Sequence, residues 1–341
     1  MKSAVFYKKE DLRIEELEIP EIKPDEVLIK VHACGICGTD IHIFDGDKGA
    51  AATPPKTVLG HEFAGEIVKT GEAVTDFKVG DKVCVDPNKL CNRCHFCKCG
   101  KGHFCTDITG IGTTVNGGFS EYCAVADSQV YKFSDKTSYA MAAMTEPVAC
   151  CLHGIDMCNI KHGDTVAIIG AGMIGLIMLQ LAKLGGAAKL IVLEPIEEKR
   201  KLAKSLGADL TIDSIHEDIN KVLKENDINQ IDVVIECVGK TNTIETGIEI
   251  AGKGATVMMF GLTKPDDTVP IKPFEIFKKE IVLKASYINP YTQERALNLI
   301  ASGKIDVKSM IYKEISLDEL PMILASKTER TKGKNIVTPQ L

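Results

Sequence analysis

The spacing of apolar residues changes twice along the chain. From residue 1 to about 134, short apolar runs are separated by Gly and Pro, as in segments 26–31, 66–70 and 81–85. Turn residues recur roughly every 8–12 positions, which is typical of antiparallel strands. The first region is therefore predicted to be rich in β-structure.

After Tyr139 the pattern becomes one of alternating strands and helices. The Ala- and Met-rich stretch that begins there predicts a helix. Continuous apolar runs then predict strands that are buried on both faces. The predicted strands are 164–169, 190–193, 231–237 and 255–260, and the predicted helices between them are 174–184, 197–206 and 241–251. This order indicates a doubly wound parallel sheet.

The chain length and the last change of pattern predict two domains. The 341 residues correspond to about two domains of roughly 150 residues each. After Tyr287 a helix at 293–302 leads into a mixed polar tail, which we expect to rejoin the first region. We predict an α/β protein with one domain formed by 1–147 and 286–341 and a second formed by 148–285.

Composition excludes several classes of protein. Apolar residues make up 45% and charged residues 26%, as in soluble globular proteins. The net charge of −6 argues against nucleic-acid binding. The longest nearly apolar run, 166–179, is too short and too rich in glycine to span a bilayer. The N-terminus has no secretory signal, so a cytoplasmic location is expected.

The cysteines indicate metal binding. Of 13 cysteines, six lie between Cys84 and Cys105, and a reducing compartment favours metal ligands over disulfides. Four of them, in the pattern C-x2-C-x2-C-x7-C, predict a closed structural zinc site. Cys99 could replace Cys97 as a ligand in a shifted register. These four are Cys91, Cys94, Cys97 and Cys105.

A second group of residues predicts an open metal site. Cys37 and His61 are the best ligands, and the third is a carboxylate from Glu62 or Glu146. Three protein ligands and one exchangeable position characterise catalytic zinc. Asp40 is placed to accept the second ring N–H of His61. Cys34 is expected to be a small buried residue.

Residues 170–175, Gly-Ala-Gly-Met-Ile-Gly, follow a predicted strand and open a predicted helix. This context is required for a dinucleotide-binding turn. Glu194 follows the second strand, where it can bind both ribose hydroxyls and repel a 2′-phosphate, which favours NAD over NADP. Lys199 and Arg200 lie nearby and weaken that preference. The predicted contacts in this turn are Gly170, Gly172, Met173, Ile174 and Gly175.

Together these motifs resemble the zinc-dependent medium-chain alcohol and polyol dehydrogenases over essentially the whole chain. The segment Gly60-His61-Glu62-x2-Gly65-x5-Gly71-x2-Val74 matches the zinc signature of that family at every fixed position. The resemblance implies a GroES-like catalytic domain, a Rossmann domain that binds the cofactor, and an active site between them. It also implies an assembly of two or four identical subunits.

The resemblance assigns further roles. It implies that Thr39 contacts the substrate oxygen and that His42 ends a proton relay. A hydroxyl can both accept and donate a proton, and histidine titrates near neutral pH. It also implies a cofactor phosphate contact for Lys334. The positions implied to line the cofactor are Val238, Gly261 and Leu262.

The substrate is less specified than the family. Gly38 and the pair Glu146-Pro147 resemble the sorbitol or iditol dehydrogenase branch, but Ile288-Asn289 stands where animal sorbitol dehydrogenases have Arg-Tyr. Alternatives are 2,3-butanediol, threonine and sugar-alcohol-phosphate dehydrogenases. The last requires cations near the active site, for which Lys48 and Lys56 are candidates. A zinc-ribbon binding protein would explain only the four-cysteine cluster.

Overall fold

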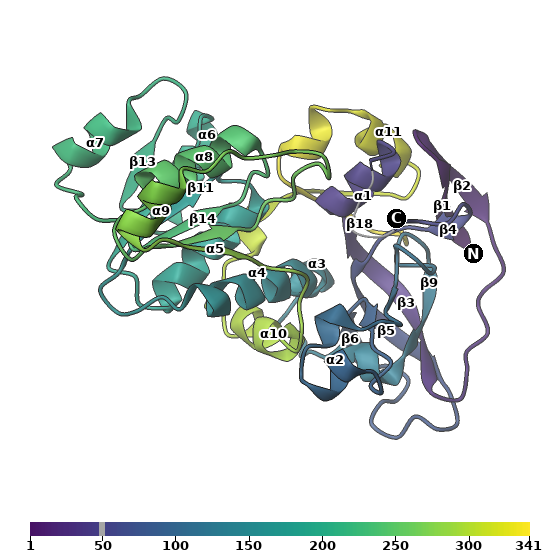
Figure 1. Ribbon diagram of the computed structural model, residues 1–341. Helices are drawn as coiled ribbons and strands as arrows, with labels where there is room; N and C mark the ends of the chain where they lie inside the picture. The colour runs from purple at the N-terminus through teal and green to yellow at the C-terminus, as the bar shows by residue number, and fades with distance from the viewer. Residues whose placement is uncertain (48–51) are drawn as a thin grey trace. The chain divides into compact units, whose positions relative to one another are not determined.

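The computed structural model describes residues 1–47 and 52–341, so Lys48 lies outside the described residues. It divides into two compact units (Figure 1). The first unit comprises Met1–Ala149 and Pro290–Leu341, and the second comprises Cys150–Asn289. The boundaries predicted from the sequence were 147/148 and 285/286. The chain therefore leaves the first unit once and returns to it.

The first unit contains mostly β-structure. Its strands are β1 (Lys2–Lys8), β2 (Asp11–Glu16), β3 (Glu26–Gly35), β4 (Thr57–Val58), β5 (Glu62–Thr70), β6 (Lys82–Val85), β7 (Asn88–Lys89), β8 (Thr109–Gly110), β9 (Tyr122–Ala126), β10 (Val130–Lys132), β17 (Ile311–Ile315) and β18 (Lys334–Val337). Its helices are α1 (Gly38–Phe44), α2 (His95–Lys98), α3 (Tyr139–Ala143), α10 (Gln293–Ala301) and α11 (Leu320–Ala325), and α4 (Thr145–Cys158) continues into the second unit.

Strand β3 organises the main sheet of this unit. It pairs antiparallel with β5, β9 and β18, and its apolar side chains belong to a core that includes Val27, Ile29 and Phe63. At its end, Gly35 pairs with Glu62 of β5 and with Ile336 of β18. This register brings three segments that are distant in sequence to one point.

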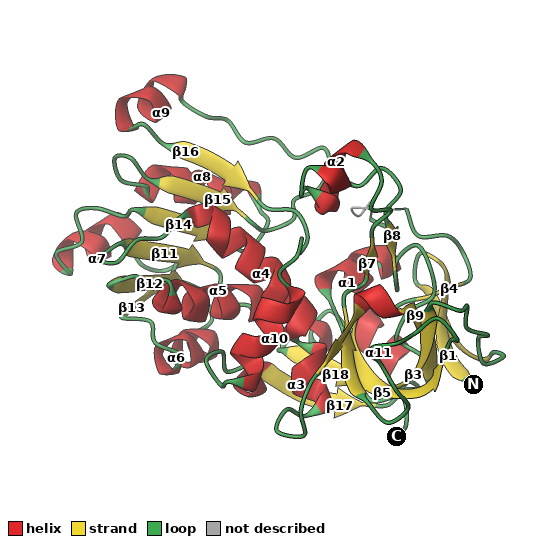
Figure 2. Ribbon diagram, turned by 90° about the horizontal axis from the view of Figure 1, so that it is seen from below, coloured by secondary structure: helices red, strands yellow, loops and turns green. Residues whose placement is uncertain are grey.

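The second unit is built on a six-stranded parallel sheet (Figure 2). The strand order is β13-β12-β11-β14-β15-β16. The strands are β11 (Thr165–Ile169), β12 (Lys189–Leu193), β13 (Leu210–Ile212), β14 (Val233–Glu236), β15 (Thr256–Met259) and β16 (Val282–Ala285). The helices are α5 (Met173–Leu184), α6 (Glu197–Ser205), α7 (Ile219–Glu225), α8 (Thr241–Ile250) and α9 (Pro273–Lys279). The order reverses direction at β11, which is where such sheets bind ligands.

The long periodic elements agree with the sequence prediction, whereas several short ones were not predicted. Strands β3 and β5 are longer than expected because each continues to the paired residues Gly35 and Glu62. Strands β13 and β16 were missed because neither is a continuous apolar run of four residues: β13 has three residues, and β16 contains Lys284. Among the described residues, no helix is both long and apolar enough to cross a membrane.

Candidate functional site

Cys37, His61 and Glu62 form a three-residue cluster in the first unit. One potential ligand atom from each lies within 4.8 Å of the other two. Cys37 directly precedes α1, and Glu62 is the first residue of β5. The pairing of β3 with β5 places these segments together. The donor set is one sulfur, one nitrogen and one carboxylate oxygen, which is a set that zinc accepts.

The buried atoms of the cluster fit a bound cation. His61 is 5% exposed and Glu62 is 0% exposed. Neither His61 Nδ1 nor Glu62 Oε1 has a hydrogen-bond partner, and buried polar atoms are costly when they are left unpaired. A zinc ion held here would give Glu62 Oε1 a partner, whereas Nδ1 of His61 faces Asp40.

Asp40 lies beside the same cluster. One of its carboxylate oxygens, Oδ2, accepts a hydrogen bond from the backbone N–H of Cys37 at 2.8 Å. The other, Oδ1, lies 3.6 Å from His61 Nδ1, which is longer than a hydrogen bond. Burial raises the pKa of the Cys37 thiol, so a bound cation would be needed to favour the thiolate.

Glu146 is not part of this cluster. It lies in the first turn of α4 and is 8% exposed. The group of three candidate ligands contains Glu62 and omits Glu146. Of the two carboxylates that the sequence left open, Glu62 is therefore the one beside Cys37 and His61.

Lys334 is buried against the cluster. Its ammonium forms an ion pair with Glu62 Oε2 and donates a hydrogen bond to the carbonyl of Ile36 at 2.8 Å. Burial alone would lower the pKa of Lys334, but Glu62, Cys37 and Asp40 together outweigh it and the net shift is upward. A side chain at Gly35 would overlap the side-chain ends of Glu62 and Lys334, so a larger residue there would displace this ion pair. This ion pair was not expected from the sequence.

Thr39 and His42 lie three residues apart on α1, a spacing that places them on the same side of a helix. His42 Nδ1 lies 3.0 Å from Asp47 Oδ2. If the Nδ1–H group of His42 donates a hydrogen bond to Asp47, the other ring nitrogen, Nε2, is available to accept a proton. Sequence reasoning missed Asp47; an acidic residue five positions after His42 was its only signal.

The four-cysteine cluster is also present. Ligand atoms of Cys91, Cys94, Cys97 and Cys105 lie within 4.8 Å of one another. Backbone N–H groups of Cys91 and Asp107 donate to the sulfur of Cys105, each at 3.4 Å. The amides of Cys97 and Thr106 lower the pKa of the Cys94 thiol to about 6. These amides favour the Cys94 thiolate, the form that binds zinc, whereas burial and the neighbouring thiols raise the pKa of Cys97 to about 12.

Cys99 lies outside that cluster. It is exposed, and its sulfur is 3.9 Å from the ring nitrogens of His95. Of the two registers that the sequence allowed, the structure therefore brings Cys97 to the other three cysteines.

In the second unit, the glycine turn connects β11 to α5. Gly170 has φ of +95°, a backbone conformation that favours glycine. A side chain at Gly175 would overlap the carbonyl of Gly170, whereas the space beside Gly172 is open. Gly172 is also the N-cap of α5, with Met173 and Ile174 in the first turn. The turn thus has the shape needed for a phosphate at a helix N-terminus.

Glu194 follows β12 and supports this turn. Its two carboxylate oxygens accept hydrogen bonds from the backbone N–H groups of Ala171 at 2.8 Å and Ile196 at 3.0 Å. Lys199 lies on α6. Arg200 is already engaged, because its guanidinium bonds the Glu194 carbonyl at 2.7 Å and pairs with Asp213 at 3.2 Å.

Val238 and Leu262 follow β14 and β15 at the carboxyl end of the sheet. They are apolar, yet 39% and 56% exposed. Gly261 precedes Leu262. These are the positions at which the resemblance placed cofactor contacts.

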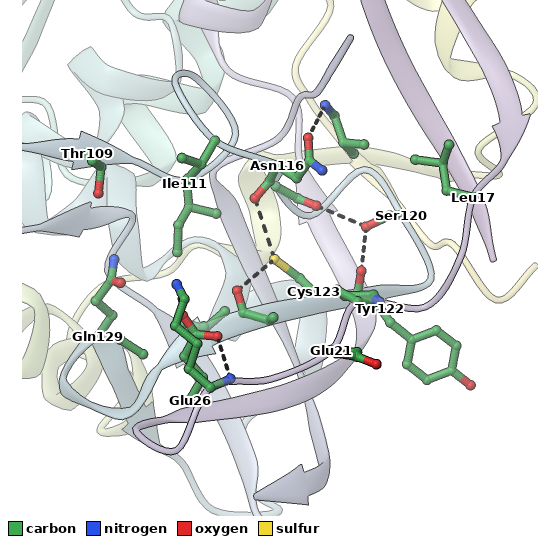
Figure 3. A pocket seen from close by; sticks show the side chains of 18 of the residues that line it. Leu17, Glu21, Glu26, Thr109, Ile111, Asn116, Ser120, Tyr122, Cys123 and Gln129 are labelled. Atoms are coloured by element: carbon green, nitrogen blue, oxygen red, sulfur yellow. Dashed lines mark hydrogen bonds and ion pairs between the residues drawn. The ribbon is translucent and has the colours of Figure 1, made fainter. Parts of the chain in front are cut away.

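A separate cavity of about 540 Å³ lies in the first unit (Figure 3). None of its lining residues belongs to either ligand cluster. Ser120 Oγ lies 2.9 Å from the Gly117 and Tyr122 carbonyls, and burial raises the pKa of the Cys123 thiol to about 12. Neither Ser120 nor Cys123 is therefore an activated nucleophile.

Comparison with known proteins identifies two family domains. Residues 23–135 match the alcohol dehydrogenase GroES-like domain, and residues 174–302 match the zinc-binding dehydrogenase domain.

Curated relatives match nearly the whole chain. L-threonine 3-dehydrogenase of Caldanaerobacter subterraneus is 35% identical over 97% of this chain and 93% of its own length. Sorbitol dehydrogenase of Bacillus subtilis is 34% identical over 94% and 91%. D-arabitol-phosphate dehydrogenase of Enterococcus avium is 36% identical over 89% and 87%.

Solved structures share the same architecture. A zinc-binding dehydrogenase of Sinorhizobium meliloti 1021, bound to NADP, superposes with a TM-score of 0.95 and is 38% identical over 99% of both chains. An alcohol dehydrogenase of Escherichia coli CFT073, in complex with NADH, has a TM-score of 0.91 and is 28% identical over 99% of both chains.

Proposed function

Since the chain belongs to the zinc-dependent medium-chain alcohol dehydrogenase family, we propose that it transfers a hydride between a small secondary alcohol or polyol and NAD. The observation that carries this proposal is the cluster of Cys37, His61 and Glu62. It is supported by a glycine turn of dinucleotide-binding shape in the second unit. Neither feature would be required in a zinc-ribbon binding protein.

We propose that Cys37, His61 and Glu62 hold a zinc ion. Bound there, zinc would supply Lewis acidity, which lowers the pKa of an alcohol oxygen or polarises a carbonyl. A second zinc is proposed for the four-cysteine cluster. Four sulfur ligands fill its coordination shell, so no position remains for a substrate and its role is structural. On this basis the chain binds two zinc ions.

The residues of α1 are proposed to handle the proton. Thr39 accepts it from the substrate hydroxyl and donates its own, because a hydroxyl can do both. His42 then passes the proton to water through Nε2, while Asp47 holds the ring by the 3.0 Å contact to Nδ1. A nicotinamide cofactor bound in the second unit would supply the hydride acceptor.

The environment of Glu194 supports NAD as the cofactor. A carboxylate after the second strand binds ribose hydroxyls and repels a 2′-phosphate. Arg200, one of the two cations that the sequence placed near such a phosphate, is bound to Asp213 and to backbone carbonyls. The Sinorhizobium meliloti relative was solved with NADP, so both cofactors belong in the test.

Threonine is the second candidate substrate, because the threonine dehydrogenase relative matches 97% of the chain. Sugar-alcohol phosphates are the third, on the strength of the arabitol-phosphate dehydrogenase relative. We favour a polyol because of the carboxylate ligand set and the Glu146-Pro147 pair. We also propose a reducing cytoplasmic location, in which cysteines serve as metal ligands more readily than they form disulfides.

The proposal is tested by following NADH or NADPH absorbance with a substrate panel. The panel contains sorbitol, D-arabitol, D-arabitol phosphate, 2,3-butanediol and L-threonine, each with NAD and with NADP. We expect a polyol with NAD to be oxidised fastest, and Cys37→Ser to abolish turnover while NADH binding persists. The matched control is Cys34→Ser, a buried thiol outside the cluster. Retained activity in Cys37→Ser would reject the metal site, and no oxidation of any member would reject the substrate class.

A further inference from the structure

Glu236, the last residue of β14, is a fully buried carboxylate. One of its oxygens, Oε1, accepts three hydrogen bonds. The donors are the backbone N–H of Val238 at 2.8 Å, the backbone N–H of Gly239 at 2.9 Å and the hydroxyl of Thr243 at 2.8 Å. Its side chain therefore fixes the turn between β14 and α8.

The backbone of the same residue fixes a second turn. The carbonyl of Glu236 accepts hydrogen bonds from the N–H groups of Phe260 and Gly261, both at 2.9 Å. These two residues follow β15. One residue thus holds the segments that leave two neighbouring strands of the sheet.

The two turns are in contact through glycines. Gly239 has φ of +76°, and a side chain there would overlap the backbone of Leu262. A Cβ at Gly261 would lie 2.8 Å from Glu236 Oε2, which is too close for a real contact. The second carboxylate oxygen has no hydrogen-bond partner. Together with the backbone of Gly239, which is closer still, it leaves room only for glycine at position 261.

The same turns reach the dinucleotide-type turn. A Cβ at Gly170 would lie 2.6 Å from Cγ2 of Val238, so the first glycine of that turn packs directly against Val238. The turns after β11, β14 and β15 therefore form one continuous surface at the carboxyl end of the sheet. This is the edge at which open α/β sheets bind nucleotides.

Burial of side chains does not hold this surface in place. Val238 and Leu262 are 39% and 56% exposed, so their own packing contributes little to the position of the turns. The hydrogen bonds to Glu236 supply what packing does not. A buried acceptor with several donors is costly to remove, because each donor is then left without a partner.

We propose that Glu236 is a positioning residue for the cofactor. It holds the two turns at the spacing in which Val238, Gly261 and Leu262 can line the dinucleotide. This inference rests on the proposed dinucleotide-binding function of the second unit. It predicts that Glu236 controls cofactor affinity without contacting zinc or the substrate.

The test measures NADH binding by fluorescence titration in the zinc-loaded full chain. Glu236→Leu removes the acceptor and is expected to weaken NADH binding about 100-fold, and Thr243→Val removes one donor and is expected to weaken it about tenfold. Glu236→Gln keeps an acceptor oxygen and is expected to stay within about threefold of the unmodified protein. In kinetics, KM for NAD should rise more than kcat falls.

Each outcome decides the proposal. If Glu236→Leu does not fold, Thr243→Val gives the answer, because it keeps the carboxylate and removes only one hydroxyl, which contacts Glu236 and the backbone of Lys240. Unchanged NADH affinity in a folded Thr243→Val variant would overturn the inference, as would a loss of kcat with unchanged KM for NAD. If the unmodified protein itself did not bind NADH, the proposed function would fail and not only this inference.

Discussion

At the scale of single residues, the net charge around the proposed zinc site is the one that a divalent cation neutralises. With Cys37 as a thiolate, Asp40 and Glu62 add two negative charges and Lys334 adds one positive charge. A divalent cation would bring the sum to zero. Buried charges are tolerated when they are compensated in this way, so Lys334 and a metal ion share the task of compensating the carboxylates.

This balance makes the effect of Lys334 depend on zinc. In zinc-free protein, Lys334→Met leaves Glu62 buried without a cation and is expected to cost about 3 kcal/mol of the free energy of unfolding. In zinc-loaded protein the loss should be smaller, because the ion still compensates Glu62. Denaturant unfolding with and without a chelator measures both values. The control is Lys332→Met, whose partner Glu329 lies at the surface; equal losses with and without zinc would contradict the argument.

At the scale of elements, local spacing could be predicted and long-range pairing could not. The four cysteines lie within one short segment, so their spacing alone predicted the cluster that the structure contains. The glycine turn was likewise evident from its place between a strand and a helix. In contrast, Lys334 and Glu62 are 272 residues apart. Their contact depends on the pairing of β18 with β3, which no local pattern specifies.

The cysteine lobe also tests which register binds zinc. Cys97→Ser is expected to reduce zinc content from about two to about one per chain and to lower the melting temperature, because a four-ligand site loses one ligand. Cys99→Ser, two residues away and exposed, is the matched control and should change neither. Metal analysis and calorimetry provide the measurements. If Cys99→Ser lost zinc and Cys97→Ser kept it, the ligand would have to be reassigned.

At the scale of the whole molecule, the return of the chain to its first unit is the feature that the sequence specifies least. The change of pattern after Tyr287 predicted that it returns, but β17 and β18 alternate polar and apolar residues only weakly. Their place is fixed by the register of Ile336 with Gly35 and Val337 with Cys34. Register is a property of the assembled sheet, and the sequence of one strand alone does not contain it.

The second unit also presents an apolar surface at the edge of its sheet. β16 pairs only with β15 in the sheet order, and its first residue, Val282, is 46% exposed. Phe274 and Phe277 on the neighbouring helix α9 are 68% and 78% exposed. Exposed strand edges and aromatic patches favour association. We propose that a second copy of the chain covers this surface.

A charge placed on this surface should therefore disrupt assembly. Phe277→Glu is expected to shift the protein from dimer or tetramer towards monomer, because a carboxylate would be buried in the interface without a partner. Light scattering coupled to size-exclusion chromatography gives the mass directly, and zinc content shows that the subunit is intact. Ile215→Glu is the control, since Ile215 is 70% exposed and lies outside this surface. An unmodified protein that is monomeric at micromolar concentration would rule out the interface, and a Phe277→Glu variant of unchanged mass would place it elsewhere.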